Sequence, residues 1–153
     1  MKMEIERKFL VRGEAWRDLA EGVPFRQGYL QTRPCTVRVR TEGARGVLTI
    51  KGPSQGLARQ EFEYEIPVEE ADLMLDTLAQ RPLIQKRRYA VPYKGFVWEV
   101  DEFFEENAGL IVAEIELSYE AQPFEKPEWI GEEVTGARRY SNASLSVLPF
   151  SRW

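Results

Sequence analysis

The stretch MEIERKFLVRG, residues 3–13, alternates charged and apolar side chains. Its even positions begin with Glu4, Glu6 and Lys8, and its odd positions are apolar except for Arg7, which this pattern leaves unexplained. Because successive side chains of a strand point to opposite faces, the stretch predicts a strand with one charged and one apolar face. It also raises the question of why a strand would align two carboxylates and an ammonium group.

The same alternation returns in seven further stretches. In one of them Arg38 and Arg40 share a face opposite Val37 and Val39, and in the last Glu114 and Glu116 share a face. The stretches are PFRQGYLQT (24–32), CTVRVRT (35–41), GVLTIKG (46–52), ARQEFEYEI (58–66), IQKRRYAV (84–91), GFVWEVDEF (95–103) and GLIVAEIELS (109–118). With turn residues between them, they bring the prediction to about eight strands.

Helical spacing of apolar residues interrupts this pattern in two places. Residues 13–22, GEAWRDLAEG, and 68–80, VEEADLMLDTLAQ, each place apolar side chains on one side of a helix. The stretch RYSNASLSVL, 139–148, predicts a third helix with Ser141 or Asn142 as N-cap. We expect the apolar faces of the strands to receive these helices, which leaves the charged faces to point elsewhere.

The charged faces have two interpretations. In most half-exposed antiparallel sheets the polar face meets water, which accounts for the alternation but not for a face on which nearly every position is ionised. Closing the sheet removes its edges, and a barrel of about eight strands has an interior that can hold one small ligand. We therefore expect a mainly β (α+β) fold, a closed eight-stranded antiparallel β-barrel that forms a charged tunnel, with a few helices packed outside.

Charges in a tunnel wall are costly to desolvate unless they are paired or matched by a ligand. The expected inward cations are Lys8, Arg38, Arg40, Lys51, Arg59, Lys86 and Arg88, and the inward carboxylates are Glu4, Glu6, Glu61, Glu63, Glu99, Asp101, Glu114 and Glu116. Guanidinium and ammonium groups suit phosphate oxygens, so we predict a chain of phosphates as the ligand. The carboxylates would repel that ligand unless a divalent cation lay between them, and all-oxygen ligation favours Mg²⁺ or Mn²⁺.

Composition excludes several alternatives. The 153 residues, 43% of them hydrophobic, predict a single domain over 1–153. The absence of histidine excludes histidine bases and histidine-bound zinc, and the single cysteine, Cys35, excludes an internal disulfide. A net charge of −4 argues against a nucleic-acid partner, and no apolar run reaches the roughly 18 residues of a membrane helix. We therefore expect a cytoplasmic protein without a membrane partner.

The motifs resemble one family closely. EIERK matches the ExExK signature of the CYTH domain, the superfamily of triphosphate tunnel metalloenzymes. The resemblance continues in order through RQGYL, VRVR, LTIKG, RQEFEYEI, KRRY, WEVDEF, AEIEL and GEEVTGARRYSNASL, and so covers nearly the whole chain. ExExK alone is only moderately specific, but the ordered succession of RxR, K, RxExE, KxR, ExD and ExE is strong support for membership.

The resemblance implies a role for each matching position. The positions that match metal ligands are Glu4, Glu6, Glu114 and Glu116, and weaker metal or water-positioning candidates are Glu61 and Glu63. Lys86 matches a lysine of the chemical step. The basic positions that match substrate-binding residues are Lys8, Arg38, Arg40, Lys51, Arg59, Arg88 and Arg139. Asp101 matches an acidic position to which we assign no role beyond orienting a basic neighbour or an outer-shell metal water.

The resemblance also implies a reaction, the metal-dependent hydrolysis of phosphoanhydride bonds. The compact form looks most like the inorganic triphosphatase branch, which converts tripolyphosphate to pyrophosphate and phosphate. Thiamine triphosphatase and class IV adenylyl cyclase are alternatives within the family, and a non-catalytic polyphosphate- or nucleotide-binding module is an alternative from another class. The expected partner is a small polyanion, and the chain is expected to be a monomer or a homodimer.

Overall fold

The computed structural model describes residues 1–153, and β-strands are its main regular structure. The strands are β1 (Lys2–Val11), β2 (Gly22–Gln31), β3 (Thr36–Glu42), β4 (Arg45–Lys51), β5 (Ala58–Ile66), β6 (Ile84–Tyr93), β7 (Phe96–Phe103), β8 (Ile111–Glu116) and β9 (Ile130–Glu133). The helices are α1 (Val68–Thr77) and α2 (Asn142–Leu145), with 3-10 turns η1 (Ala15–Asp18), η2 (Glu105–Asn107), η3 (Arg138–Tyr140) and η4 (Phe150–Arg152). No helix is long and apolar enough to cross a membrane.

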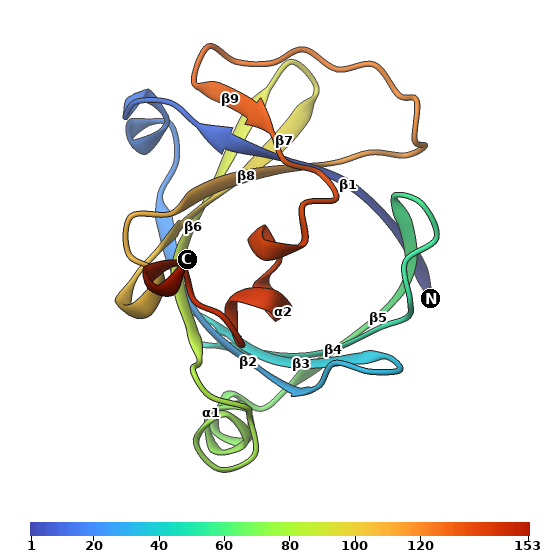
Figure 1. Cartoon of the computed structure of the whole chain (residues 1–153), viewed down its shortest axis with the longest axis vertical. Helices are drawn as coiled ribbons and strands as arrows, with labels where there is room; N and C mark the ends of the chain where they lie inside the picture. The colour runs from blue at the N-terminus through green and yellow to red at the C-terminus, as the bar shows by residue number, and fades with distance from the viewer.

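Strands β1 to β8 form a closed antiparallel barrel, as the alternation predicted. The order is β5-β4-β3-β2-β6-β7-β8-β1, and β1 pairs again with β5 to close the ring. Strand β1 achieves this by dividing its length: Lys2–Ile5 pair with β5, and Glu6–Leu10 pair with β8. Figure 1 shows the strands as a ring around an open interior, with α1 outside it.

The apolar faces of the strands point outward and are covered there. Phe9 of β1 and Trp98 of β7 are fully buried and meet edge to face, with ring centroids 5.5 Å apart. Trp16 of η1 packs in the same cluster, so the first predicted helix does cover the barrel. That helix is one 3-10 turn because Gly22 already pairs with Tyr89 as the start of β2.

Helix α1 covers a second part of the outer surface. Ala71 and Leu75 are fully buried against Val39 of β3. The helix ends at Thr77, three residues before the predicted end, and the Gln80 N–H donates to the Tyr29 carbonyl at 2.9 Å instead of continuing it. This contact fixes the end of α1 against β2.

Helix α2 occupies a different place from the one predicted. Ser141, one of the two predicted N-cap residues, is its N-cap, with its Oγ accepting from the Ser144 N–H at 3.1 Å. The helix does not pack outside the barrel, however; Figure 1 shows it within the ring, and Ser141, Asn142 and Ala143 line the interior cavity. The reason is that the preceding segment is tied to β1, where the Val134 N–H donates to the Lys8 carbonyl at 2.8 Å.

Strand β9 was not predicted, and its contacts explain why Arg7 interrupts the apolar face of β1. Strand β9 pairs with the end of β1 at Phe9 and Val11. The Arg7 guanidinium, on the outer face of β1, donates to both carboxylate oxygens of Glu133 at 2.6 and 2.8 Å and lies 4.9 Å from the centroid of the Phe124 ring. Arg7 therefore fastens the long segment between β8 and the C-terminal region to the barrel wall.

Candidate active site in the barrel interior

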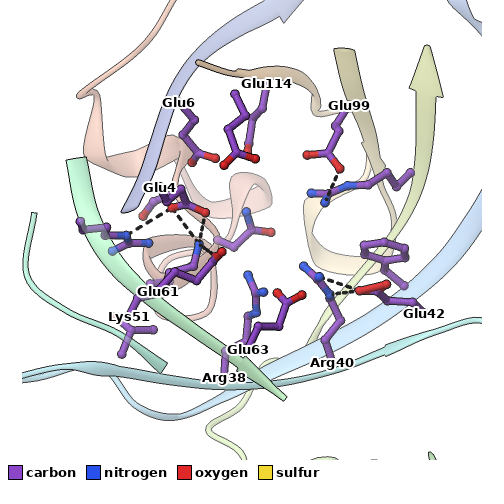
Figure 2. Close-up of a pocket in the computed structure, with 18 of the residues that line it drawn as sticks. Glu4, Glu6, Arg38, Arg40, Glu42, Lys51, Glu61, Glu63, Glu99 and Glu114 are labelled. Atoms are coloured by element: carbon purple, nitrogen blue, oxygen red, sulfur yellow. Dashed lines mark hydrogen bonds and ion pairs between the residues drawn. The ribbon is translucent and has the colours of Figure 1, made fainter. Parts of the chain in front are cut away.

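The charged faces of the strands enclose one cavity of about 370 Å³. Fourteen of the fifteen charged residues predicted to point inward line it, and the exception, Asp101, lies buried directly behind two of the cations. The lining residues that the charge pattern did not single out are Lys2, Phe25, Tyr29, Thr36, Glu42, Arg45, Ser141, Asn142 and Ala143. Figure 2 shows Glu6, Glu99 and Glu114 across the space from the arginines of β3, with further carboxylates beside those arginines.

One corner of the cavity gathers charges from β1, β4 and β5. Lys51 Nζ donates to both oxygens of Glu4 at 2.9 and 3.0 Å, and Arg59 Nε lies 3.5 Å from the same carboxylate (Figure 2). Burial raises the pKa of Glu4, but Lys51 outweighs it and keeps the pKa below the ordinary value. Glu61 lies 3.6 Å from Lys51, and burial together with Glu4 raises its pKa. These pairs hold the Lys51 and Arg59 side chains at the cavity wall, where their charges can also bind an anion.

Two carboxylates face one another between β1 and β8. Figure 2 shows the Glu6 and Glu114 side chains pointing toward each other. Glu114 has Lys8 Nζ at 3.5 Å, whereas Glu6 forms no ion pair. Burial, followed by the charges of Glu114 and Glu4, raises the pKa of Glu6 well above its ordinary value. Adjacent buried carboxylates of this kind are stabilised by a cation between them.

The four predicted metal ligands do not form a preassembled cluster. Glu116 pairs with Lys2 at 3.1 Å near the mouth, and Glu4 pairs with Lys51, so no three acidic side chains converge on one point. The donor set nevertheless fits a hard divalent cation, because the facing carboxylates supply only oxygen and Glu6 is without an ion-pair partner. The residues that would hold it are Glu6 and Glu114, with Glu4 and Glu116 beside them.

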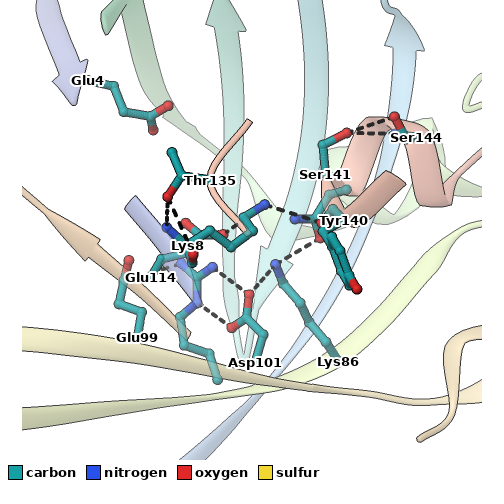
Figure 3. A network of polar contacts seen from close by, with 12 residues as sticks. Glu4, Lys8, Lys86, Glu99, Asp101, Glu114, Thr135, Tyr140, Ser141 and Ser144 are labelled. Carbon is teal, nitrogen blue, oxygen red and sulfur yellow. Dashed lines mark hydrogen bonds and ion pairs between the residues drawn. The ribbon is translucent and has the colours of Figure 1, made fainter. Parts of the chain in front are cut away.

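A buried triad joins β6 and β7. Asp101 accepts from Arg88 through two hydrogen bonds, at 2.7 and 2.8 Å, and its Oδ2 lies 2.8 Å from Lys86 Nζ (Figure 3). Lys86 Nζ also donates to Asn142 Oδ1 of α2 at 3.1 Å. Burial lowers the pKa of Lys86 to about 7 even though Asp101 raises it. Asp101 therefore orients two basic neighbours, and α2 supports one of them.

Strand β3 contributes two arginines to the cavity wall. Arg40 pairs with Glu42 at 2.6 Å, while Arg38 Nη2 donates to Thr49 at 3.1 Å and its buried Nε has no partner. Burial, Arg38 and Arg88 lower the pKa of Arg40 to about 10, so the guanidinium stays charged at neutral pH. An orphaned buried donor in a cationic wall is suited to an anionic ligand.

Arg139 is the one predicted site residue that the structure does not bring to the cavity. Its side chain is exposed and its guanidinium lies 4.4 Å from the Trp153 ring and 5.3 Å from the Tyr140 ring. It is absent from the lining because these aromatic side chains hold it on the outer side of the C-terminal segment. The tunnel contacts this segment instead through Lys8, whose Nζ donates to the Tyr140 carbonyl at 3.2 Å, and through Lys86 at Asn142 (Figure 3).

Comparison with known proteins places this geometry in a family. Residues 2–148 match the family model of the CYTH domain. An inorganic triphosphatase of Acetivibrio thermocellus is 51% identical over 154 residues, covering 100% of this chain and 99% of that protein. An inorganic triphosphatase of Nitrosomonas europaea is 38% identical over 149 residues, covering 94% and 97%.

A solved structure supports the same relationship. The crystal structure of an inorganic triphosphatase superposes with a TM-score of 0.68 at 35% identity and covers 94% of this chain and 97% of that one. Fold, motif order and sequence identity agree over nearly the full length. The chain belongs to the CYTH domain family.

Proposed function

We propose that this protein is a divalent-metal-dependent inorganic triphosphatase, which hydrolyses tripolyphosphate to pyrophosphate and phosphate. The observation on which this rests is the single cavity in which cations from β3 to β6 face carboxylates from β1 and β8. Phosphoryl transfer depends mainly on positioning and on neutralising charge, and fixed cations provide both. The similarity to two proteins named inorganic triphosphatases supports this choice of reaction.

The carboxylates have the roles of cation ligands in this proposal. Glu6 and Glu114, assisted by Glu4 and Glu116, would hold Mg²⁺ or Mn²⁺, with Glu61 and Glu63 as further ligands or as acceptors for an attacking water. A bound divalent cation would neutralise phosphate charge and lower the pKa of a bound water. If Glu4 held a cation, Arg59 would lose its ion-pair partner and Lys51 would keep only Glu61 at 3.6 Å, which would leave both cations more available to phosphate.

The basic residues divide into two sets by exposure to the cavity. Lys86 lines the cavity but is only 2% exposed, and there it would stabilise charge or deliver a proton at the reacting phosphate or leaving group. The proposed phosphate ligands in the wall are Lys8, Arg38, Arg40, Lys51, Arg59 and Arg88. We do not include Arg139 among them, because it has no contact with the cavity.

The lining favours an unsubstituted triphosphate over an organic one. Only three lining residues, Phe25, Tyr29 and Ala143, are apolar. The Phe25 ring lies 4.9 Å from each of the Arg40 and Arg88 guanidinium groups, so these cations cover it and it offers no surface for stacking a base or a thiazolium ring. Thiamine triphosphatase and adenylyl cyclase activities are therefore less well supported.

A substrate panel tests the proposal. Tripolyphosphate, thiamine triphosphate, ATP and pyrophosphate would each be incubated with Mg²⁺, Mn²⁺ or Ca²⁺, and phosphate and cyclic AMP would be measured. We expect tripolyphosphate with Mg²⁺ or Mn²⁺ to give the highest kcat/KM. Preferential formation of cyclic AMP from ATP would overturn the proposed branch, and tight binding of tripolyphosphate without turnover would indicate a binding module.

A further inference from the structure

Lys2 is a cation at the mouth of the tunnel, just before the stretch 3–13 in which the charge pattern was recognised. It is the first residue of β1 and continues the inward row formed by Glu4, Glu6 and Lys8. Its side chain lines the cavity, although it is 55% exposed. The ammonium group is therefore accessible to water and also part of the wall that faces the ligand.

This ammonium group links two strands of the barrel. Strand β1 lies between β8 and β5, and Lys2 Nζ lies 3.1 Å from Glu116 of β8 and 3.6 Å from Glu61 of β5. Glu61 also has Lys51 at 3.6 Å, whereas Lys2 is the only ion-pair partner of Glu116. The position of the Glu116 carboxylate therefore depends on Lys2.

Glu116 lies beside another carboxylate. It is opposite Glu6 in the register of β1 and β8, and side chains at opposed positions of antiparallel strands are about 5 Å apart at Cβ. Like charges at such positions repel each other. Lys2 offsets this repulsion at the Glu116 end of the carboxylates, which is the effect that a divalent cation would also have there.

The ammonium group and a divalent cation compete for the same carboxylate oxygens. We propose that a divalent cation displaces Lys2 from Glu116 when it binds, and that the released ammonium group then binds a phosphate oxygen of the incoming tripolyphosphate. Lys2 thus opposes metal binding without substrate and assists substrate binding once the metal is in place. A lysine is suited to this exchange, because its ammonium group is a compact charge on a flexible stem. The inference rests on the proposed function.

The test compares Lys2→Gln with Lys94→Gln. Both substitutions remove the charge of an exposed, paired lysine: the side chains are 55% and 54% exposed, and Lys94 pairs with Glu125 at 3.4 Å outside the cavity lining. The affinity for Mg²⁺ would be measured without substrate, from the rise in melting temperature with Mg²⁺ concentration above each protein's own value in EDTA. The KM for tripolyphosphate would be measured at saturating Mg²⁺.

We expect the two affinities to change in opposite directions. Because an exposed ion pair is weak, Lys2→Gln should bind Mg²⁺ about two- to fivefold more tightly than the wild type, and its KM for tripolyphosphate should rise by a similar factor. Lys2→Arg keeps the charge and should lie closer to the wild type in both measurements, and Lys94→Gln should match the wild type. A lysine with a merely structural role would weaken both affinities when replaced.

The outcomes separate this inference from the proposed function. Lys2→Gln that binds Mg²⁺ no more tightly than the wild type would overturn the inference, and so would an unchanged or lower KM for tripolyphosphate. The melting experiments require no turnover. If the wild type hydrolysed no tripolyphosphate, the proposed function would fail, and the Mg²⁺ affinities would still decide whether Lys2 competes with the metal.

Discussion

The ammonium group of Lys86 lies 2.8 Å from the carboxylate of Asp101, and both side chains are almost completely closed off from water. The same carboxylate takes two hydrogen bonds from Arg88, so one anion holds two cations at the tunnel wall. This arrangement fixes the positions of the Lys86 and Arg88 charges. We therefore expect substitutions within it to have large effects on activity and stability.

The first prediction concerns Lys86 itself. Lys86→Ala removes a preorganised donor from the proposed reaction centre, and we expect kcat for tripolyphosphate to fall by about a hundredfold or more. Lys94→Ala is the matched control, because Lys94 is an exposed lysine in the turn between β6 and β7. Steady-state phosphate release measures both variants. Near wild-type turnover in Lys86→Ala would show that this lysine has no part in the chemical step.

The second prediction concerns Asp101. Asp101→Asn keeps the shape of the side chain but leaves Lys86 and Arg88 buried without their shared anion, so we expect a loss of about 3 kcal/mol in the free energy of unfolding. Urea denaturation measures this loss. Asp18→Asn, at an exposed position of η1, should change the value by less than about 0.5 kcal/mol. A variant as stable as the wild type would mean that Asp101 does not compensate these cations.

The third prediction is a pH dependence at Glu6. The folded-state pKa of Glu6 is raised above its unfolded value, so its contribution to stability is fully present at acid pH and is lost as the pH rises through the folded-state pKa. In EDTA, Glu6→Gln should therefore raise the melting temperature by about 2–4 °C at about pH 8, and by less at about pH 5. The same variant should lose the stabilisation that Mg²⁺ gives the wild type.

The control for Glu6 is Glu128→Gln, at an exposed position between β8 and β9. We expect this variant to melt within about 1 °C of the wild type at both pH values. A lower melting temperature for Glu6→Gln in EDTA near pH 8 would contradict the view that the ionised carboxylate is unfavourable without a cation.

The fourth prediction concerns the pair that anchors β9. Glu133→Gln weakens its bidentate contact with Arg7, and because both side chains are about one-third exposed we expect a loss of about 0.5–1 kcal/mol at neutral pH. The hydrogen bond from Arg7 lowers the pKa of Glu133 to about 2, so the difference should shrink as the pH falls from about 4.5 toward 2. Urea denaturation tests this, with neighbouring Glu132→Gln as the control that should match the wild type.

The barrel could be predicted from sequence because each strand shows a period of two over most of its length. The inward direction of the charges followed from their number, since a face of ionised residues such as Glu114 and Glu116 is unusual for a solvated sheet. The structure confirms the strands and the closure. Strand β9 escaped prediction because Ile130–Glu133 is too short to show a period, and only its partner Arg7 hinted at it.

The positions of the C-terminal residues could not be predicted in the same way. The Ser141 cap is a local signal and was recognised, but the placement of α2 in the tunnel depends on distant contacts such as that between Val134 and Lys8. Arg139 matched a motif, yet stacking on Trp153 keeps it away from the cavity. Tyr29 lines the cavity but is uncharged, so the charge pattern of the sequence did not indicate it.

The most direct test of the central claim is the initial rate of phosphate release from tripolyphosphate, measured with Mg²⁺ and again with EDTA. We expect turnover that requires the metal and yields one phosphate and one pyrophosphate for each tripolyphosphate. Glu4→Gln and Glu116→Gln should each abolish it. Binding of tripolyphosphate without any release of phosphate, or turnover that both variants retain, would contradict this claim.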